Sequence, residues 1–145
     1  MNTYSFLATL PLFDDLPAQL LQDIVTSIVK RSFASGEVIV KQGDRAEECF
    51  IVLSGGAIVS YEVAPAIGKT AVIATLSSGD LFGEIALLDN SARAADVIAT
   101  EPTECLVIRK ENIRRLADNN HTFALRLLTL VVTRLSEMEK QASTH

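Results

Sequence analysis

Apolar and polar positions along the chain change their period twice. From about residue 17 to residue 30 the apolar side chains recur at helical spacing and form one stripe. The residues of that stripe are Leu20, Leu21, Ile24, Val25 and Ile28. From about residue 33 to 108 the pattern consists of short β-rich runs, and from about 110 to 141 helical spacing returns. The pattern predicts a helix, then a β region, then further helices.

The β region is divided by turn residues at short and nearly regular intervals. Its β-rich runs cover residues 38–40, 49–53, 57–63, 70–76, 95–99 and 105–108. Glycine-containing segments lie between them, at Gly43-Asp44, Gly55-Gly56, Gly68 and Gly79-Asp80. Many short strands with this spacing are typical of an antiparallel sandwich or roll.

The C-terminal part predicts a short helix over 110–117, a break at 118–120 and a long helix over 121–141. The apolar residues of the long helix cover more than one narrow stripe; they are Leu127, Leu128, Val131, Val132, Leu135 and Met138. One face is expected to pack on the β region. The remaining apolar surface indicates a second function, either as a lid over a ligand or as the contact of a homodimer.

Size and composition predict one folded domain over residues 1–145, with 48% hydrophobic residues and a mean hydropathy of +0.27. A disordered chain is excluded by that hydrophobic content. No apolar run approaches the length of a membrane span, and the amino terminus does not resemble a secretory signal, so we expect a cytoplasmic location. The net charge of −5 argues against direct nucleic-acid binding by this chain.

Residues able to bind metals or to perform nucleophilic chemistry are few and scattered. Cys49 and Cys105 each lie beside apolar strand residues, so we expect reduced core thiols, with a disulfide or a metal site as the alternative. His121 and His145 do not form a metal-ligand pattern. No Ser, His and acid constellation is present, so we expect neither an enzyme nor a metal cofactor.

The segment from Phe82 to Val97 carries the most specific chemistry. Its sequence is FGEIALLDNSARAADV. The Glu84 carboxylate is an acceptor that suits a sugar hydroxyl, and the Arg93 guanidinium is a planar fork of donors that matches phosphate oxygens. Residues 84–88 read as a short helical turn whose N–H groups would point at an anion. Small Ala94 and Ala95 allow main-chain N–H groups to approach a ligand closely.

This segment resembles the phosphate-binding cassette of the cyclic-nucleotide-binding domain family, whose usual form is F-G-E-[LIM]-A-L-[LIM]-x-x-x-P-R-[AST]-A-[TS]-V. Residues 36–44, 50–56 and 76–81 are also similar to the family, and the resemblance extends over about residues 6–141. Two positions depart from the pattern. Ala92 stands where the family has proline, which removes a fixed φ before Arg93. Asp96 stands where the family has Thr or Ser, and strand alternation predicts that it points away from Arg93.

The resemblance implies a mainly β fold with flanking helices: an antiparallel jelly roll (a double-stranded β-helix) with an N-terminal helix and a long C-terminal helix. It implies a regulatory domain that binds a cyclic nucleotide and signals through movement of its C-terminal helix. The implied ligand-binding residues are Phe82, Gly83, Glu84, Ile85, Ala86, Arg93, Ala94 and Ala95, with Ile73 and Ala74 beside the purine.

The ligand expected from the resemblance is cAMP, with cGMP less favoured. Family members that prefer cGMP often carry Thr directly after the arginine, whereas Ala94 has no hydroxyl. Two other readings stay open. One is a jelly roll that dimerises without binding a nucleotide, including the sensor fragment of a transcription regulator that lacks its DNA-binding part. The other, an enzyme such as a phosphodiesterase, lacks a nucleophile or metal centre in this sequence.

Overall fold

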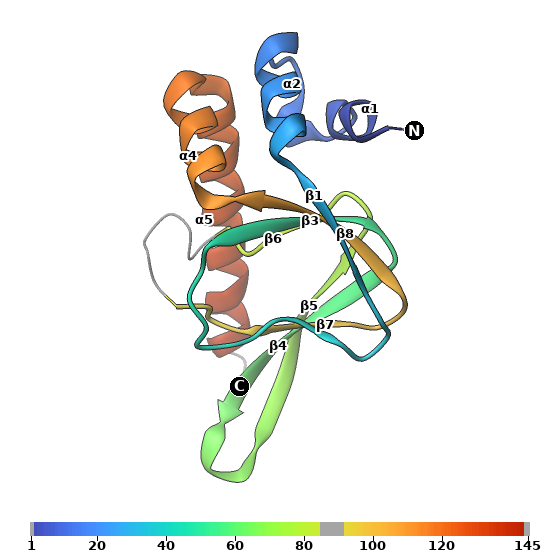
Figure 1. Cartoon of the computed structure of the whole chain (residues 1–145). Coiled ribbons are helices and arrows are strands. Elements are labelled where there is room, and N and C mark those ends of the chain that lie inside the picture. The colour runs from blue at the N-terminus through green and yellow to red at the C-terminus, as the bar shows by residue number, and fades with distance from the viewer. Residues whose placement is uncertain (1, 85–91, 144–145) are drawn as a thin grey trace. The chain divides into compact units, whose positions relative to one another are not determined.

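The computed structural model describes residues 2–84 and 92–143, which form two compact units (Figure 1). One unit contains the strands and extends from Val29 to Val107. The other contains the helices and combines the chain up to Ile28 with the chain from Ile108 onward. This division follows the two changes of hydrophobic period, because each period suits one type of element.

The β unit consists of two four-stranded antiparallel sheets. One sheet has the order β1-β8-β3-β6 and the other the order β2-β7-β4-β5. The strands are β1 (Val29–Phe33), β2 (Val38–Val40), β3 (Glu48–Ser54), β4 (Gly56–Ala64), β5 (Lys69–Ser77), β6 (Leu81–Phe82), β7 (Asp96–Ala99) and β8 (Thr103–Arg109). The predicted class, mainly antiparallel β with flanking helices, is confirmed.

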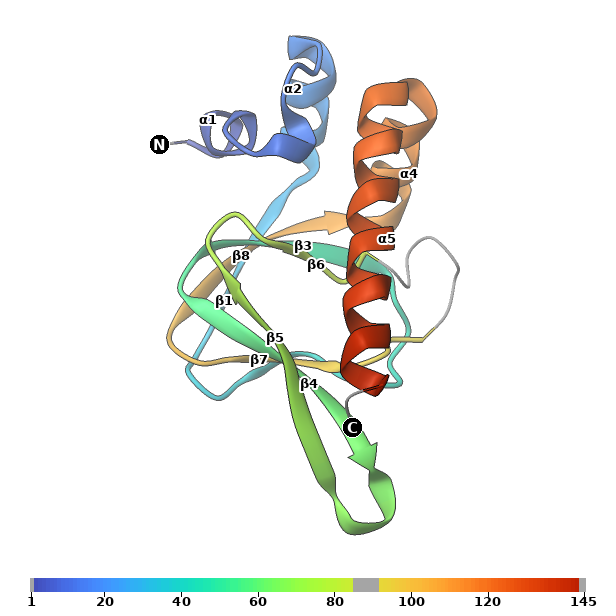
Figure 2. The same ribbon diagram turned by 180° about the vertical axis from the view of Figure 1, so that it is seen from behind.

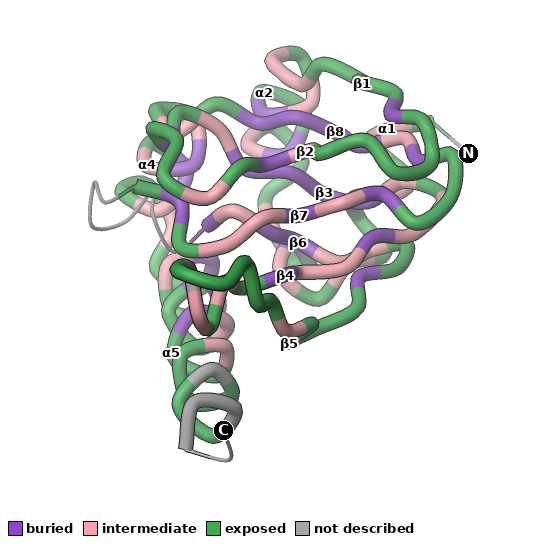
Figure 3. Tube along the Cα trace, turned by 90° about the horizontal axis from the view of Figure 1, so that it is seen from below, coloured by how far each residue is buried: buried purple, intermediate pink, exposed green. Residues whose placement is uncertain are grey.

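A hydrophobic core is built from the inward-facing residues of both sheets. Its members are Phe33, Val40, Phe50, Val52, Ala57, Leu76, Phe82, Val97, Ala99, Cys105 and Val107. Buried segments run along β3 and β8 in particular (Figure 3). Phe50 and Phe82 are directly paired across β3 and β6, and their rings stack with centroids 5.0 Å apart. The apolar side of each sheet is thereby removed from water, which is the main stabilising contribution.

Strands β4 and β5 form a long two-stranded ribbon at the edge of their sheet (Figure 2). Their pairing runs from Gly56 opposite Ser77 to Ala64 opposite Lys69, while β7 pairs with β4 only as far as Ser60. The outer half of the ribbon therefore has no third strand among the described residues. Its large apolar side chains, including Tyr61, Val63 and Val72, are correspondingly exposed.

The helical unit contains α1 (Thr3–Ala8), the 3-10 turn η1 (Pro11–Phe13), α2 (Ala18–Ser27), α4 (Lys110–Asn119) and α5 (His121–Ser143). The rings of Phe13 and Phe123 pack with centroids 5.7 Å apart, and Arg126 donates a hydrogen bond to the Asp14 carbonyl. The break predicted over 118–120 is confined to Asn120, because α4 continues to Asn119. Asn120 is extended there, and its Oδ1 accepts a hydrogen bond from the Phe123 N–H at 2.9 Å, which caps α5.

Some boundaries differ from the sequence prediction. Helix α2 ends at Ser27 instead of near residue 30, because Ile28 is already extended and Val29 pairs with Val107 as the first residue of β1. Apolar Ile28 and Val29 continue the helical stripe in the sequence, but β-branched residues fit a strand equally well. Strands β1 and β6 and the segments α1 and η1 were not predicted.

Candidate functional site

Arg93 is a buried arginine whose guanidinium is held by main-chain carbonyls. Its Nη1 donates to the Gly83 carbonyl at 2.7 Å, and its Nη2 donates to the Glu48 carbonyl at 2.5 Å. The guanidinium carbon lies 6.0 Å from the centroid of the Phe50 ring. Only 8% of Arg93 is exposed. The charged end of this side chain therefore has a defined position between β3 and the end of β6.

The main chain of Arg93 is fixed as well. Its N–H donates to the Asp44 carbonyl at 2.8 Å, and its carbonyl accepts from the Gly43 N–H at 2.9 Å. Ala92 and Arg45 form an antiparallel bridge beside this pair. The turn that follows β2 thus holds the backbone from which the Arg93 side chain projects.

Gly83 follows β6 and contacts the guanidinium directly. Its φ is +84°, and a Cβ added there would lie 2.8 Å from Arg93 Nη1. An L side chain is disfavoured at this backbone conformation, and it would also occupy the position of the arginine. Glycine is therefore required at position 83 by both the turn and the contact.

Glu84 is only 2% exposed, and it is one of the groups that act on the Arg93 charge. Burial lowers the pKa of the Arg93 guanidinium, and nearby Cys49, Glu48, Glu84 and Asp44 oppose that shift. The guanidinium remains protonated, because arginine does not lose its proton in proteins. The site therefore combines one buried cation with a buried carboxylate close enough to influence it.

The two cysteines are free and buried. Burial raises the pKa of the Cys49 thiol, Glu84 and Glu48 raise it further, and Arg93 lowers it. Burial also raises the pKa of Cys105, to about 11. Both side chains are consequently neutral thiols near neutral pH. Over the part of the chain that the structure describes, no group of three or more His, Cys, Asp or Glu residues is suited to hold a metal ion.

The structure brings Phe82, Gly83 and Arg93 together and buries Glu84 next to Gly83 in the chain. Ala94 and Ala95 follow Arg93, the first exposed and the second half-buried. Ile73 and Ala74 lie separately on β5 in the other sheet, where Ile73 is half-buried and Ala74 is exposed. Ile85, Ala86 and the predicted helical turn over 84–88 lie outside the described residues, apart from Glu84 itself.

Two participants were not identified from the sequence. Glu48 contributes its carbonyl oxygen, which every residue has, so no residue type signals the contact. Phe50 contributes the ring beneath the guanidinium, and its position opposite Phe82 is a consequence of strand register. The sequence offers one signal for this contact: Phe50 and Phe82 each begin a segment that resembles the family.

The geometry suits a small anion. A guanidinium has five N–H donors, and the recorded side-chain hydrogen bonds of Arg93 use one on Nη1 and one on Nη2. The planar fork of a guanidinium matches an anion with two adjacent oxygens. Along the described stretches, no helix has the length and apolarity needed to cross a membrane.

Comparison with protein families gives a match to the model described as "Cyclic nucleotide-binding domain" over residues 30–120. This range contains the whole β unit except Val29, together with α4. It also contains each of the contacts described for Arg93.

The similar proteins include a kinase, a kinase regulatory subunit and a Catabolite Activator Protein. The chain is 40% identical to the cAMP-dependent protein kinase regulatory subunit of Mycosarcoma maydis over 99 residues, which cover 68% of this chain and 18% of that protein. It is 33% identical to the cGMP-dependent protein kinase, isozyme 1, of Drosophila melanogaster over 116 residues, covering 79% and 15%. Among solved structures, the Catabolite Activator Protein of Thermus thermophilus matches with a TM-score of 0.79 and 29% identity, covering 92% of this chain and 62% of that one.

The matched part is a small fraction of the two kinase-related proteins, since it spans less than a fifth of either. The two relatives are named for different cyclic nucleotides.

Proposed function

The chain belongs to the cyclic nucleotide-binding domain family and is a regulatory domain of that type, and on this premise we propose that its ligand is cAMP and that Arg93 and Glu84 hold it. Arg93 binds the cyclic phosphate through its guanidinium. Glu84 accepts a hydrogen bond from the ribose 2′-hydroxyl. The remaining proposed contacts are those expected of Phe82, Gly83, Ile85, Ala86, Ala94 and Ala95 around the phosphate and ribose, and of Ile73 and Ala74 beside the purine.

The observation that carries this proposal is the position of the buried Arg93 guanidinium. Two main-chain carbonyls and one aromatic ring orient it. A cation fixed in this way loses little conformational entropy when an anion arrives, which favours binding. A cyclic phosphodiester carries a single negative charge, so one arginine with a few N–H groups is sufficient. A triphosphate would need more cations and a metal ion.

The preference for cAMP rests on Ala94. Relatives named for cAMP and relatives named for cGMP are both similar to this chain. A guanine base presents an amino group that a hydroxyl after the arginine is suited to meet, and Ala94 supplies only a methyl group. We therefore propose that cAMP binds more tightly than cGMP.

Helix α5 is the proposed output of the domain. Phe123, Leu127 and Val131 are buried along one side of it, whereas Leu125, Leu128, Val132 and Leu135 are exposed. The exposed residues follow a 3-4-3 spacing, which is the seam of a two-stranded coiled coil. We propose that this seam joins two copies of the chain and that cAMP biases the position of the helix. The free energy by which cAMP can shift α5 from one arrangement to the other equals the difference between its binding free energies for the two arrangements.

A thermal-shift experiment tests the ligand assignment. At a concentration one hundred times its dissociation constant, cAMP is expected to stabilise the fold by about 2.7 kcal/mol. For a domain of this size that corresponds to a rise in Tm of about 5–10 °C. The expected order of the shifts is cAMP, then cGMP, then linear 5′-AMP, which lacks the cyclic phosphate and is expected to have almost no effect.

The same series of ligands also distinguishes nucleotide binding from the alternative function. If millimolar cAMP and cGMP both leave Tm unchanged, the chain does not act as a nucleotide sensor. The reading as an interaction domain that dimerises without a nucleotide is then favoured. A larger shift with cGMP than with cAMP would keep the binding function and reverse the base preference.

A further inference from the structure

Asp96 makes a contact that the family pattern does not predict, because that pattern has Thr or Ser at this position. Asp96 is the first residue of β7, and its Oδ1 accepts a hydrogen bond from the Gln42 N–H at 2.6 Å. Residues 42 and 96 are 54 positions apart, so this bond joins two distant parts of the chain. The side chain is only partly exposed, and its carboxylate is directed to the main-chain amide of Gln42.

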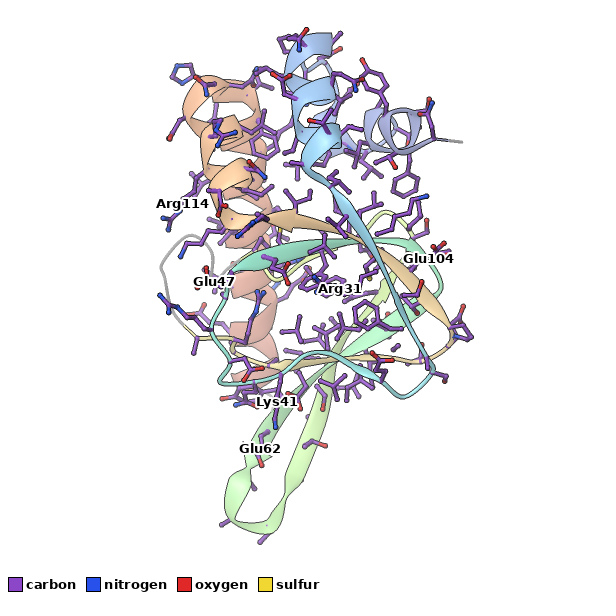
Figure 4. The ribbon with its side chains drawn as sticks, viewed as in Figure 1. Arg31, Lys41, Glu47, Glu62, Glu104 and Arg114 are labelled. Atoms are coloured by element: carbon purple, nitrogen blue, oxygen red, sulfur yellow. The ribbon has the colours of Figure 1, made fainter. Side chains whose placement is uncertain are left out.

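Gln42 belongs to the turn that holds the main chain of Arg93. The turn begins at Lys41, labelled in Figure 4, whose carbonyl accepts from the Asp44 N–H at 3.1 Å. Gly43 donates to the Arg93 carbonyl, and the Asp44 carbonyl accepts from the Arg93 N–H. Three hydrogen bonds thus connect this four-residue turn to residues 93 and 96, and the Asp96 bond is the one made by a side chain.

Ala92 gives this bond a specific role. Proline, the usual residue at this position, fixes φ directly before the arginine and lowers the entropy lost on ordering the segment. Alanine lacks that restraint. The N–H of Arg93, and not that of Ala92, makes the bond to Asp44, so the recorded pairing does not depend on an amide at position 92.

We propose that Asp96 is a positioning residue for Arg93: its bond to Gln42 restrains the turn over residues 41–44 and thereby replaces the stiffness that proline would give at position 92. The role in ligand binding rests on the proposed function. The role in ordering the turn does not. Because the acceptor is a carboxylate, the bond is stronger than one to a neutral hydroxyl.

Two variants and one rescue test this role by amide hydrogen exchange on the unliganded protein. Asp96→Ala removes the acceptor, and the N–H groups of Gly43 and Arg93 are expected to exchange about tenfold faster, since a hydrogen bond to a charged group contributes about that much. Asp96→Asn keeps an oxygen acceptor and is expected to stay within about threefold of the parent protein. Ala92→Pro in the Asp96→Ala background is expected to restore most of the protection.

Glu37→Ala is the matched control. Glu37 Oε1 accepts a hydrogen bond from the Ala34 N–H at 3.1 Å, so it is also a carboxylate bonded to the amide of a turn, but in a turn without Arg93. This variant is expected to leave the exchange of Gly43 and Arg93 unchanged. Unaltered protection in Asp96→Ala would overturn the proposal. So would an equal effect of Ala92→Pro in the parent and in Asp96→Ala, because it would show that the two restraints are independent.

Titration with cAMP adds the binding readout. Asp96→Ala is expected to weaken binding about tenfold and Asp96→Asn less than threefold, with Ala92→Pro restoring affinity in the Asp96→Ala protein. If the parent protein binds no cyclic nucleotide, the proposed function fails, while the exchange data still decide whether Asp96 orders the turn. If exchange changes as expected and affinity does not, Asp96 orders the turn without positioning Arg93 for binding, and the proposal is overturned.

Discussion

Arg93 and Glu84 have complementary hydrogen-bonding chemistry. The guanidinium only donates and suits phosphate oxygens, while an ionised carboxylate only accepts and suits a hydroxyl. Both side chains are almost fully buried. Burial lowers the pKa of Arg93, and Glu84 is among the groups that oppose this lowering. The two residues are expected to contact separate parts of one ligand. Their contributions to the binding free energy can therefore be measured separately, by changing the ligand as well as the protein.

Glu84→Gln tests the ribose contact. The amide is nearly isosteric but places an N–H₂ donor where one of the carboxylate oxygens was, so affinity for cAMP is expected to fall by about 1.5–3 kcal/mol. For 2′-deoxy-cAMP, which lacks the hydroxyl, the same substitution is expected to cost much less. Competition titrations of both proteins with both ligands give the coupling free energy between Glu84 and the 2′-hydroxyl. An equal loss for the two ligands would show that Glu84 does not contact the 2′-hydroxyl.

The strands and turns around the site were predictable to different degrees. The six β-rich runs correspond to β2, β3, β4, β5, β7 and β8, because each contains enough apolar or β-branched residues to show its period. Strand β6 has only two residues, Leu81 and Phe82, and exists through its pairing with β3. Arg93 donates to the Gly83 carbonyl directly after β6 and to the Glu48 carbonyl in β3, so it bridges these two paired strands. Which residues of two distant segments pair with each other is not determined by either segment alone, so the local sequence pattern does not predict this register.

Gly83→Ala tests the turn after β6. Both Gly83 and Gly36 have positive φ, +84° and +86°, but a Cβ on Gly36 would meet no atom within 4 Å, whereas one on Gly83 would meet Arg93. Each substitution is expected to destabilise the fold by about 1–2 kcal/mol through backbone strain. Only Gly83→Ala is expected to lower cAMP affinity, because the guanidinium must move.

Denaturant unfolding and calorimetric titration of both variants measure the two effects separately. Equal affinities in Gly83→Ala and Gly36→Ala would mean that the observed position of the guanidinium is unimportant for binding.

At the scale of the whole molecule, an acidic chain carries an uncharged helical seam. The net charge is −5, yet Leu125, Leu128, Val132 and Leu135 are all exposed along α5. Such a continuous apolar stripe is unfavourable in water and typical of an interaction surface. The sequence showed that α5 has more apolar surface than one contact needs. It did not show which residues would be exposed, because that depends on which face packs within the fold.

Sedimentation of the protein tests the proposed homodimer. The parent chain is expected to sediment as a dimer at tens of micromolar, and the double substitution Leu128→Asp/Val132→Asp is expected to give a monomer, because it places two charges in the seam. Thr133→Asp is the control, since Thr133 is exposed on α5 but outside the 3-4-3 spacing. A monomeric parent chain would leave the helix with the role of a lid alone.

The most direct test of cyclic-phosphate capture by Arg93 is a calorimetric titration with cAMP of the parent protein, Arg93→Ala and Arg109→Ala. Arg109 is a matched arginine that forms an exposed ion pair with Glu111. We predict saturable binding of one cAMP per chain, a loss of about 2–5 kcal/mol in Arg93→Ala and no change in Arg109→Ala. Unchanged affinity in a folded Arg93→Ala protein, or no binding by the parent, would contradict the account.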